Sequence, residues 1–457
     1  MGMNKETVFR DPVLNSVVVK DQVILDLIGT TEFQRLRRIK QLGSANAVFH
    51  GAEHSRFSHS LGVYEIARRF EEQLTALHAT KTPGDGLWDP SERIVLLAAA
   101  LLHDLGHGPY SHTFEHIFGT NHEDYTRMII TEEGTEINAV LREYDQDLPA
   151  KVAAVINKTY PNKQVVQLIS SQIDADRMDY LLRDAYYTGA TYGEFDLSRI
   201  TRMMRPYQNG IAFEEKGLYA IEDYVVSRYQ MYVQVYFHPV ARALETILTK
   251  LLERAKFLFE QDVNETRIDK DFISLELQTV FEQREGIPVS EYLKLDDSVM
   301  LADINRWRFH SDPVLADLAK RFLDRKPLKS IEVTDETRDL LPALRDLIET
   351  AGFSVKYYTA ENDSFDQPYS DHQLQGSSQR TQIELMAQDG SRTDLSDRSA
   401  VVAALMGRAF GDTRFFFPKE MMKTDMTDDL MAAVYAEFQS YIHNGRLVAL
   451  DSVDVKE

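Results

Sequence analysis

The order of hydrophobic and polar residues divides the chain into a short hairpin, a long helical part and a mixed C-terminal part. Residues 7–19 alternate β-branched side chains around Asp-Pro and Asn-Ser, which predicts a β-hairpin. From Gln22 to about Met204 apolar residues recur at helical spacing, with Gly and Pro between the segments. The helical pattern continues to about residue 260, and Pro239 predicts a kink or a break within it.

The pattern changes near residue 265. Helical stretches at 313–325 and 336–351 alternate with the strand-like runs KSIEVT, FSVKYYT and TQIELMA, and residues 414–417 predict a buried strand. Residues 360–380, rich in Asp, Ser and Gln, predict a loop. We therefore expect a mainly α protein with an N-terminal hairpin (residues 1–20), a helical core (21–265) and a smaller α+β C-terminal lobe (266–457).

Composition narrows the functions that this chain can have. Its 457 residues are 43% hydrophobic, enough for a large core, and its net charge of −21 disfavours binding to nucleic-acid backbones. The chain has no cysteine, so any metal must be bound by His and carboxylate side chains. Neither a signal-peptide layout nor an apolar run near 20 residues is present, so we expect a soluble cytoplasmic protein without membrane contact.

Candidate metal-binding and catalytic residues follow the predicted end of an apolar helix. The helix predicted at 94–102 runs into HDLGHGPYSHTFEH, which places six ionisable side chains at the end of a buried element: His103, Asp104, His107, His112, Glu115 and His116. A lone His-Asp pair is more typical of an ordinary helix end with a surface ion pair. Here, however, His59 begins another amphipathic helix, and a third helix carries Asp174, Asp176, Asp179 and Asp184. Helices from separate parts of a bundle commonly converge ligands on its interior.

The ordered set His59, His103-Asp104 and Asp176 resembles the H…HD…D signature of the HD superfamily of metal phosphohydrolases. The runs FQRLRRIKQLG, HSRFSHSLGV, LLHDLGHGPYSHTFE, NHED and IDADRMDYLLRD resemble its deoxynucleoside triphosphate triphosphohydrolase branch, over roughly residues 7–250. The resemblance implies an HD-domain helical core that binds one divalent metal through His59, His103, Asp104 and Asp176. Mg²⁺, Mn²⁺, Fe²⁺ and Zn²⁺ all remain open for this N/O ligand set, and further Mg²⁺ would accompany the nucleotide.

The resemblance also implies roles for other residues. His107, Glu115 and His122 match an acid/base cluster, in which Glu115 stands where other members have Asp. Arg56, Arg177 and Arg228 match phosphate contacts, and the remaining substrate contacts would be Gln41, Leu42, His112, Tyr180, Asp184, Tyr236 and His238. Tyr180 would pack against the deoxyribose and Asp184 would accept the 3′-hydroxyl hydrogen, which would favour deoxynucleotides over ribonucleotides.

The same resemblance implies an oligomeric state and an activating nucleotide for this protein. It implies a homotetramer, with a dGTP or GTP activator held by Gln34, Arg37, Arg199 and Lys216. Gly29 stands where an acidic residue reads the guanine edge in the vertebrate relative, so the identity of an activator stays open. The basic run Arg35, Arg37, Arg38 and Lys40 fits a solvated helix face as well as a nucleotide-facing one.

We therefore expect hydrolysis of a dNTP to deoxynucleoside and inorganic triphosphate. The alternatives are an HD phosphohydrolase of other regiochemistry (a nucleotidase, or a cyclic-nucleotide or alarmone phosphodiesterase), a nucleotide-sensing regulator and a single-strand nucleic-acid binder, which the net charge disfavours. The histidines without such context are expected at the surface or in the core: His50, His54, His78, His116, His310 and His372.

Overall fold

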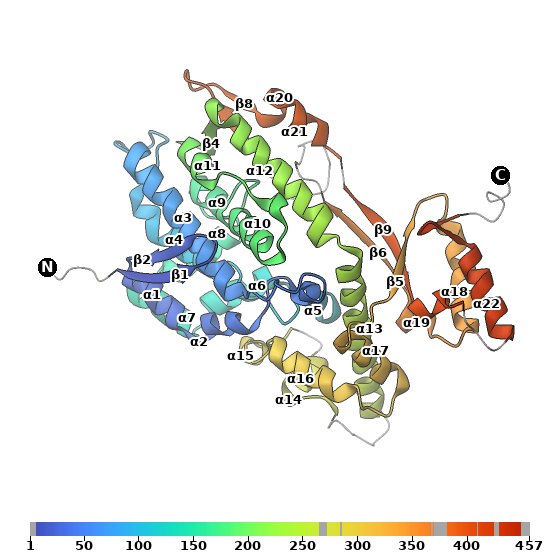
Figure 1. Cartoon of the computed structure of the whole chain (residues 1–457). Helices are drawn as coiled ribbons and strands as arrows, with labels where there is room; N and C mark the ends of the chain where they lie inside the picture. Colours follow the sequence, from blue (N-terminus) through green and yellow to red (C-terminus); the bar gives the residue numbers. More distant parts are fainter. Residues whose placement is uncertain are drawn as a thin grey trace. The chain divides into compact units, whose positions relative to one another are not determined.

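A computed structural model describes residues 6–264, 272–283, 286–366, 369, 382–408, 410–424 and 429–448. The chain forms two compact units, labelled by element in Figure 1. Unit 1 comprises residues 1–235, 285–298 and 367–408, and unit 2 comprises residues 236–284, 299–366 and 409–457. Each unit combines segments that are far apart in the chain, so the units differ from the predicted linear division at residues 20 and 265. That division concerns independently folding parts and stays a prediction.

Unit 1 begins with the predicted hairpin. Strands β1 (Thr7–Asp11) and β2 (Asn15–Val19) pair antiparallel from Thr7↔Val19 to Asp11↔Asn15. The turn places Asn15 at φ 67°, a left-handed conformation that Asn tolerates better than most residues. The hairpin is therefore confirmed, with its turn at the predicted position.

Helices make up most of unit 1. The first group is α1 (Gln22–Gly29), α2 (Thr31–Arg35), α3 (Arg56–His78), α4 (Arg93–Leu102), α5 (His112–Phe118), α6 (His122–Thr131) and α7 (Glu136–Tyr144). The second group is α8 (Leu148–Ile156), α9 (Lys163–Ile169), α10 (Ala175–Thr188), α11 (Leu197–Met203), α12 (Leu218–Met231), α15 (Val289–Tyr292), α20 (Leu395–Arg398) and α21 (Ala400–Leu405). The mainly α fold class is thus confirmed.

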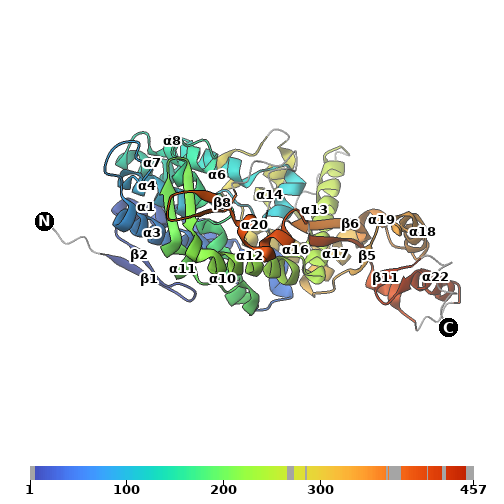
Figure 2. The same ribbon diagram turned by 90° about the horizontal axis from the view of Figure 1, so that it is seen from above.

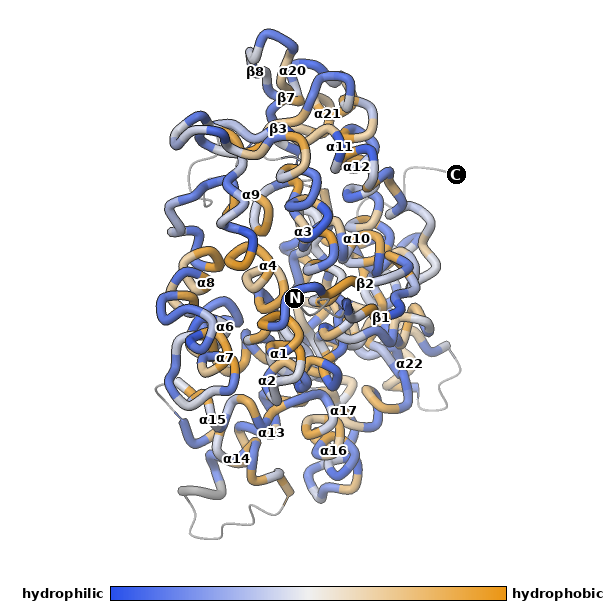
Figure 3. Tube along the Cα trace, turned by 90° about the vertical axis from the view of Figure 1, so that its left-hand side faces the viewer, coloured by the Kyte–Doolittle hydropathy of each residue, from blue (hydrophilic) through white to orange (hydrophobic). Residues whose placement is uncertain are grey.

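Helix α4 lies at the centre of the unit 1 core. Its residues from Val95 to Leu102 are all buried, and Figure 3 shows this helix as a hydrophobic stretch. Helices α3, α8 and α9 pack against it. Since α4 is apolar on every face, the polar residues that follow it at position 103 begin inside the unit.

Unit 1 also contains a four-stranded sheet in the order β3-β4-β7-β8. Strands β3 (Met204–Tyr207) and β4 (Gly210–Glu214) form a hairpin, as do β7 (Glu384–Met386) and β8 (Arg392–Asp394). Parallel pairing of β4 with β7, Phe213↔Leu385 and Glu214↔Met386, joins the two hairpins. The run TQIELMA therefore contains a strand, β7, as expected, but this strand completes the sheet of unit 1.

Unit 2 is the α+β part. Its helices are α13 (Pro239–Asn264), α14 (Leu275–Glu282), α16 (Asp297–Trp307, which begins in unit 1), α17 (Pro313–Leu323), α18 (Leu341–Thr350), α19 (Val355–Tyr358) and α22 (Asp429–Ser440). Its sheet has the order β10-β11-β5-β9-β6, formed by β5 (Lys329–Val333), β6 (Ala360–Asp366), β9 (Phe410–Phe417), β10 (Ile442–His443) and β11 (Arg446–Leu447). Strands β5 and β9 share a core with α18 and α22 that includes Ile331, Phe415, Phe417 and Phe438.

Two local predictions for unit 2 are wrong. The run FSVKYYT contains the short helix α19, which buries Tyr357 and Tyr358, and no strand. Residues 360–366, expected in a loop, form β6, because their backbone pairs with β9 from Ala360↔Phe416 to Asp366↔Phe410. Strand pairing supplied by a distant segment overrides the polar local composition. The remainder of the predicted loop lies outside the described residues except for Tyr369.

Candidate metal centre

Three helix ends bring the four predicted metal ligands together. His59 lies in the first turn of α3, His103 and Asp104 directly follow α4, and Asp176 lies in the first turn of α10. Asp174 caps α10 by accepting a hydrogen bond from the backbone N–H of Arg177, which fixes where the helix starts. Since α3 packs against both α4 and α10, the ends of these helices meet in one place.

The donor atoms converge. Nε2 of His59 lies 3.1 Å from Oδ1 of Asp176 and 3.7 Å from Oδ2 of Asp104. Nε2 of His103 lies 3.4 Å from Oδ1 of Asp104 and 3.5 Å from Oδ1 of Asp176. One atom each from His59, His103 and Asp176 falls within 4.8 Å of the others, which suits a single cation.

Hydrogen bonds fix which imidazole nitrogens face the centre. Nδ1 of His103 donates to the carbonyl oxygen of Ala100 (2.9 Å), and Nδ1 of His59 donates to Oδ2 of Asp179 (2.9 Å). In the neutral ring Nε2 then carries the lone pair, as a metal ligand requires. Nε2 of His103 is buried without a hydrogen-bond partner among the described residues, which a metal would satisfy. The donor set therefore fits a divalent cation.

The electrostatics of the cluster favour positive charge. Burial lowers the pKa of His59, but hydrogen bonds to Asp176 and Asp179 and the charge of Asp104 raise it to about 10. Burial raises the pKa of Asp104, but the charges of His103, His107 and Arg56 hold it well below its usual range. The carboxylates thus stay ionised and generate the negative potential that binds protons or a cation.

A second cluster, His107, Glu115 and His122, lies beside the first. Oε1 of Glu115 accepts from Nδ1 (2.7 Å) and from the backbone N–H (3.0 Å) of His122, and Nε2 of His107 lies 3.2 Å from Oδ1 of Asp104. The rings of His107 and His122 stack with centroids 3.9 Å apart and planes 13° apart. A cation lies in the plane of each imidazole that binds it, so two stacked parallel rings cannot both bind one ion well. The rings of His59 and His103, at 75°, have no such conflict.

Arg56 joins the metal ligands to the loop before α5. Its Nη1 donates to Asp104, and its Nε and Nη2 donate to Oγ of Ser111 (3.2 and 2.7 Å). Tyr110 and Ser111 have φ of 51° and 42°, a left-handed conformation that costs energy in residues with a side chain. A buried arginine therefore holds a strained loop next to the centre.

Helix α10 carries the next predicted substrate residues. Nε of Arg177 donates to the carbonyl of Ser171 (2.7 Å), and its Nη1 lies 3.5 Å from the hydroxyl of Tyr180. That hydroxyl lies 3.5 Å from the hydroxyl of Tyr232, whose ring lies 5.5 Å from the guanidinium of buried Arg228. The two arginines and Tyr180 therefore belong to one cluster in unit 1, in which Arg228 is buried and Arg177 and Tyr180 are partly buried.

Asp184 is paired with a histidine that the sequence left without a role. Oδ1 of Asp184 lies 2.8 Å from Nε2 of His54, both side chains are buried, and the His54 ring stacks on Tyr187. The backbone N–H of Gln41 donates to the carbonyl of His54 (3.0 Å), which brings Gln41 and its neighbour Leu42 to the same loop. His54 is thus a core histidine, as expected, but one attached to a predicted substrate residue.

The other predicted substrate contacts include Tyr236, His238 and His112. Tyr236 and His238 belong to unit 2 and are described only within it. Burial and the charge of Arg414 lower the pKa of His238. The side chain of His112 lies outside the described part of the structure, although its backbone begins α5.

The predicted activator residues form two local pairs. Nε of Arg37 donates to Oε1 of Gln34 (2.8 Å), and Nη2 of Arg199 donates to the carbonyl of Lys216 (3.0 Å). The predicted basic run does not form one face, because Arg35 is buried whereas Arg37 and Arg38 are exposed. A solvated role for Arg35 is therefore wrong.

Sequence reasoning missed a segment that holds the loop carrying His107. Arg35 donates to the carbonyls of His107 (2.9 Å) and Leu295 (2.7 Å). The carboxylate of Asp297 accepts from the backbone N–H groups of Lys40 (2.8 Å) and Tyr110 (3.0 Å). Leu295, through Arg35, and Asp297 thus hold this loop from almost 190 positions away, and no periodic pattern signals such a contact.

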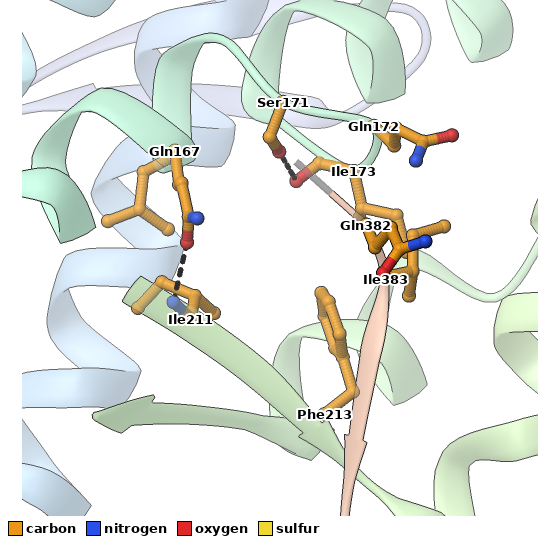
Figure 4. A pocket seen from close by; sticks show the side chains of 9 residues that line it. Gln167, Ser171, Gln172, Ile173, Ile211, Phe213, Gln382 and Ile383 are labelled. Atoms are coloured by element: carbon orange, nitrogen blue, oxygen red, sulfur yellow. Dashed lines mark hydrogen bonds between the residues drawn. The ribbon is translucent and has the colours of Figure 1, made fainter. Parts of the chain in front are cut away.

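A small cavity lies behind the loop that precedes Asp174. Figure 4 shows Gln167 accepting a hydrogen bond from the backbone of Ile211 and Ser171 donating to Ile173, with Gln382 and Ile383, which precede β7, also lining the cavity. Among the described residues, no charged side chain lines this cavity. Among the described helices, none has the length and apolar character needed to cross a membrane.

Comparison with known proteins identifies the family to which the chain belongs. Residues 56–184 match the HD domain and residues 195–265 match the HD associated region. The chain is 48% identical over 421 residues to the uncharacterised protein YwfO of Bacillus subtilis, covering 92% of this chain and 94% of that protein. It is 32% identical over 270 residues to the deoxynucleoside triphosphate triphosphohydrolase SAMHD1 homolog of Dictyostelium discoideum, covering 55% of this chain and 50% of that protein.

Solved structures agree over most of the chain. A phosphohydrolase crystal structure from Bacteroides thetaiotaomicron superposes with a TM-score of 0.76 at 26% identity, covering 90% of this chain and all of that one. A hypothetical protein from Aquifex aeolicus gives a TM-score of 0.70 at 27% identity, covering 94% of this chain and all of that one. The matched HD domain begins at Arg56 and ends at Asp184, so it contains all four predicted ligands. The chain therefore belongs to the HD-domain phosphohydrolases that carry an HD associated region.

Proposed function

We propose that this protein hydrolyses deoxynucleoside triphosphates to deoxynucleoside and inorganic triphosphate at the HD site. The observation that carries the proposal is the order of side chains along α10. Asp176 lies in the metal cluster. Arg177 and Tyr180 follow it, with Nη1 of Arg177 3.5 Å from the hydroxyl of Tyr180, and Asp184 lies about two turns after Asp176. A helix that presents a metal ligand, a cation, a phenol and a carboxylate in this order matches the order of phosphate, sugar and sugar hydroxyl in a nucleotide.

The metal ligands in this proposal are His59, His103, Asp104 and Asp176. A divalent cation bound there supplies Lewis-acid polarisation of a phosphoryl oxygen and lowers the pKa of a bound water. Arg56, Arg177 and Arg228 neutralise triphosphate oxygens, which requires Arg56 to exchange part of its contact with Asp104 or Ser111 for the phosphate. Each of these arginines is partly or wholly buried, which strengthens its interaction with an anion.

His122 is the residue that we assign as the proton donor to the departing oxygen. Its Nδ1 donates to Glu115 (2.7 Å), which orients the ring so that Nε2 is directed away from this carboxylate and can donate the proton. His107 is less suited to donate a proton, because burial and the charge of Arg56 hold its pKa well below the usual value. The longer Glu115 side chain reaches His122 at 2.7 Å, so replacing the Asp of relatives preserves this hydrogen bond.

Sugar selection would fall to Tyr180 and Asp184. Tyr180 is part of a packed cluster, so a ring held there leaves little room for a 2′-hydroxyl. Asp184 would accept a hydrogen bond from the 3′-hydroxyl, while His54 keeps its carboxylate in position. Gln41, Leu42, His112, Tyr236 and His238 complete the proposed substrate contacts.

Regulation is a separate part of the proposal. The Gln34–Arg37 and Arg199–Lys216 pairs would bind dGTP or GTP in a homotetramer. Gly29, at the end of α1, has open space around its Cα and carries no carboxylate for a guanine base. We therefore expect any activation to discriminate weakly among purine nucleotides.

Product analysis tests the activity. The purified protein is incubated with each dNTP, alone and with dGTP or GTP, in Mg²⁺ and in Mn²⁺, and products are separated by ion-exchange chromatography. Deoxynucleoside with intact triphosphate supports the proposal. Orthophosphate or pyrophosphate would instead indicate an HD phosphohydrolase of other regiochemistry, and binding without turnover would indicate a nucleotide sensor. Asp176→Ala serves as the inactive control.

A further inference from the structure

A buried chain of charged groups connects the metal ligand His59 to the N-terminal hairpin. Its first step is the hydrogen bond from Nδ1 of His59 to Oδ2 of Asp179 (2.9 Å). The side chain of His59 is 1% exposed and that of Asp179 is fully buried, so water cannot replace this partner. The bond fixes the orientation of the ring and leaves Nε2 to face the cation.

The second step is a two-point ion pair within α10. Nε of Arg183 donates to Oδ2 of Asp179 (2.8 Å), and Nη2 donates to Oδ1 (2.9 Å). Arg183 is itself fully buried. A two-point pair restricts the carboxylate to one orientation, which a single contact would not do.

The third step reaches the hairpin. Nη1 of Arg183 donates to Oδ2 of Asp11 (2.9 Å), at the end of β1. The other oxygen of Asp11 accepts from the backbone N–H groups of Val13 (2.9 Å) and Leu14 (2.8 Å) and so closes the hairpin turn. One carboxylate thus serves two elements that lie 172 positions apart in the chain.

Gly62 gives independent evidence that helix α3 packs closely against the ion pair of Asp179 and Arg183. It lies three residues after His59 in α3, where a Cβ would fall 1.8 Å from Oδ1 of Asp179 and 2.4 Å from Nη2 of Arg183. Glycine inside a helix costs about 1 kcal/mol relative to alanine. The ion pair occupies the space that a side chain at position 62 would need.

The hairpin is also fastened along α3, beside which Figure 2 shows it. The backbone N–H of Val18 donates to Glu65 (3.0 Å), the hydroxyl of Tyr64 donates to the carbonyl of Val18 (3.0 Å), and Arg69 donates to the carbonyl of Leu14 (3.0 Å). The hairpin therefore has a defined position from which Asp11 can hold Arg183.

We propose that Asp179, Arg183 and Asp11 are positioning residues for the metal ligand His59, so that the N-terminal hairpin contributes to the affinity of the cation site. This inference rests on the metal site and is independent of which nucleotide is hydrolysed. Groups that orient a ligating histidine change metal affinity by about 10–100-fold when they are removed.

The test measures Mn²⁺ binding by isothermal titration calorimetry to the full-length protein after treatment with a chelator. Asp11→Asn separates the two roles of Asp11: the amide oxygen still accepts from Val13 and Leu14, whereas the amide NH₂ cannot accept from Arg183. Arg69→Ala is the matched control, because it removes a contact between hairpin and helix without touching the chain of charges. We expect a loss of about 10–100-fold for Asp179→Asn, a smaller loss for Asp11→Asn, and wild-type affinity for Arg69→Ala.

Two outcomes would overturn the proposal: wild-type Mn²⁺ affinity in folded Asp11→Asn, or an equal loss in Arg69→Ala. Circular dichroism establishes that each variant is folded, and Asp11→Asn carries the test alone if Asp179→Asn does not fold. His59→Ala distinguishes an error in the metal assignment from an error in the role of the hairpin. If His59→Ala binds Mn²⁺ as wild type does, the metal assignment itself is wrong. If it loses binding while Asp11→Asn does not, only the role of the hairpin is wrong.

Discussion

The two acidic metal ligands, Asp104 and Asp176, should differ sharply in what their loss does to the metal-free protein. Asp104 is the ion-pair partner of Arg56, and the side chains of both are at most 10% exposed. Asp176 is 33% exposed, and its Oδ1 lies 3.1 Å from Nε2 of His59 and 3.5 Å from Nε2 of His103. Asp104→Ala therefore leaves a buried guanidinium without its carboxylate, whereas Asp176→Ala opens a partly solvated position.

The expected magnitudes follow from that difference. Removing one partner of a buried ion pair costs about 3–5 kcal/mol, so Asp104→Ala should lower the free energy of unfolding by that amount. The histidine partners of Asp176 can lose their protons when the carboxylate is removed, whereas Arg56 cannot, so Asp176→Ala should lower the free energy of unfolding less than Asp104→Ala does. Both substitutions remove a ligand, and both should abolish detectable turnover.

Urea denaturation in the presence of a chelator, followed by circular dichroism, measures the difference. The double variant Asp104→Ala with Arg56→Met removes both charges and should recover much of the stability that Asp104→Ala loses. Equal destabilisation by Asp104→Ala and Asp176→Ala, or no recovery in the double variant, would refute the assignment of Asp104 as the structural partner of Arg56.

Three further changes test other parts of the molecule. Glu115→Gln should lower kcat more than it changes KM, because His122 loses the charged acceptor of the Nδ1 hydrogen bond that orients its ring; an unchanged kcat would contradict this role. Asp297→Ala removes the acceptor of the Tyr110 N–H and should reduce kcat while Mn²⁺ affinity, measured by calorimetry, stays at the wild-type value. Burial raises the pKa of Asp303 although its carboxylate accepts hydrogen bonds from the backbone N–H and the hydroxyl of Ser274; the thermal midpoint of Asp303→Asn should therefore fall relative to that of wild type as the pH falls from 7 through that pKa, and a constant difference across pH would refute the cause.

Local patterns were enough to predict the elements that carry the chemistry. The alternation in residues 7–19 gave the hairpin, and the apolar run at 94–102 gave α4 with His103 and Asp104 at its end. These features depend on neighbours two to four positions apart, so a period of 2 or 3.6 residues reveals them. The resemblance then selected His59 and Asp176 from several histidines and aspartates, and the structure brings these residues within reach of one cation.

Only the tertiary structure decided which distant groups support that chemistry. Leu295, through Arg35, and Asp297 hold the loop of His107, strand β7 completes the sheet of unit 1, and Asp11 reaches Arg183 from the hairpin. The polar run at 360–366 became a strand because β9 lies beside it. Each of these contacts joins segments that are far apart in the chain, and their energy comes from pairing buried donors with acceptors in three dimensions, which leaves no periodic trace in the sequence.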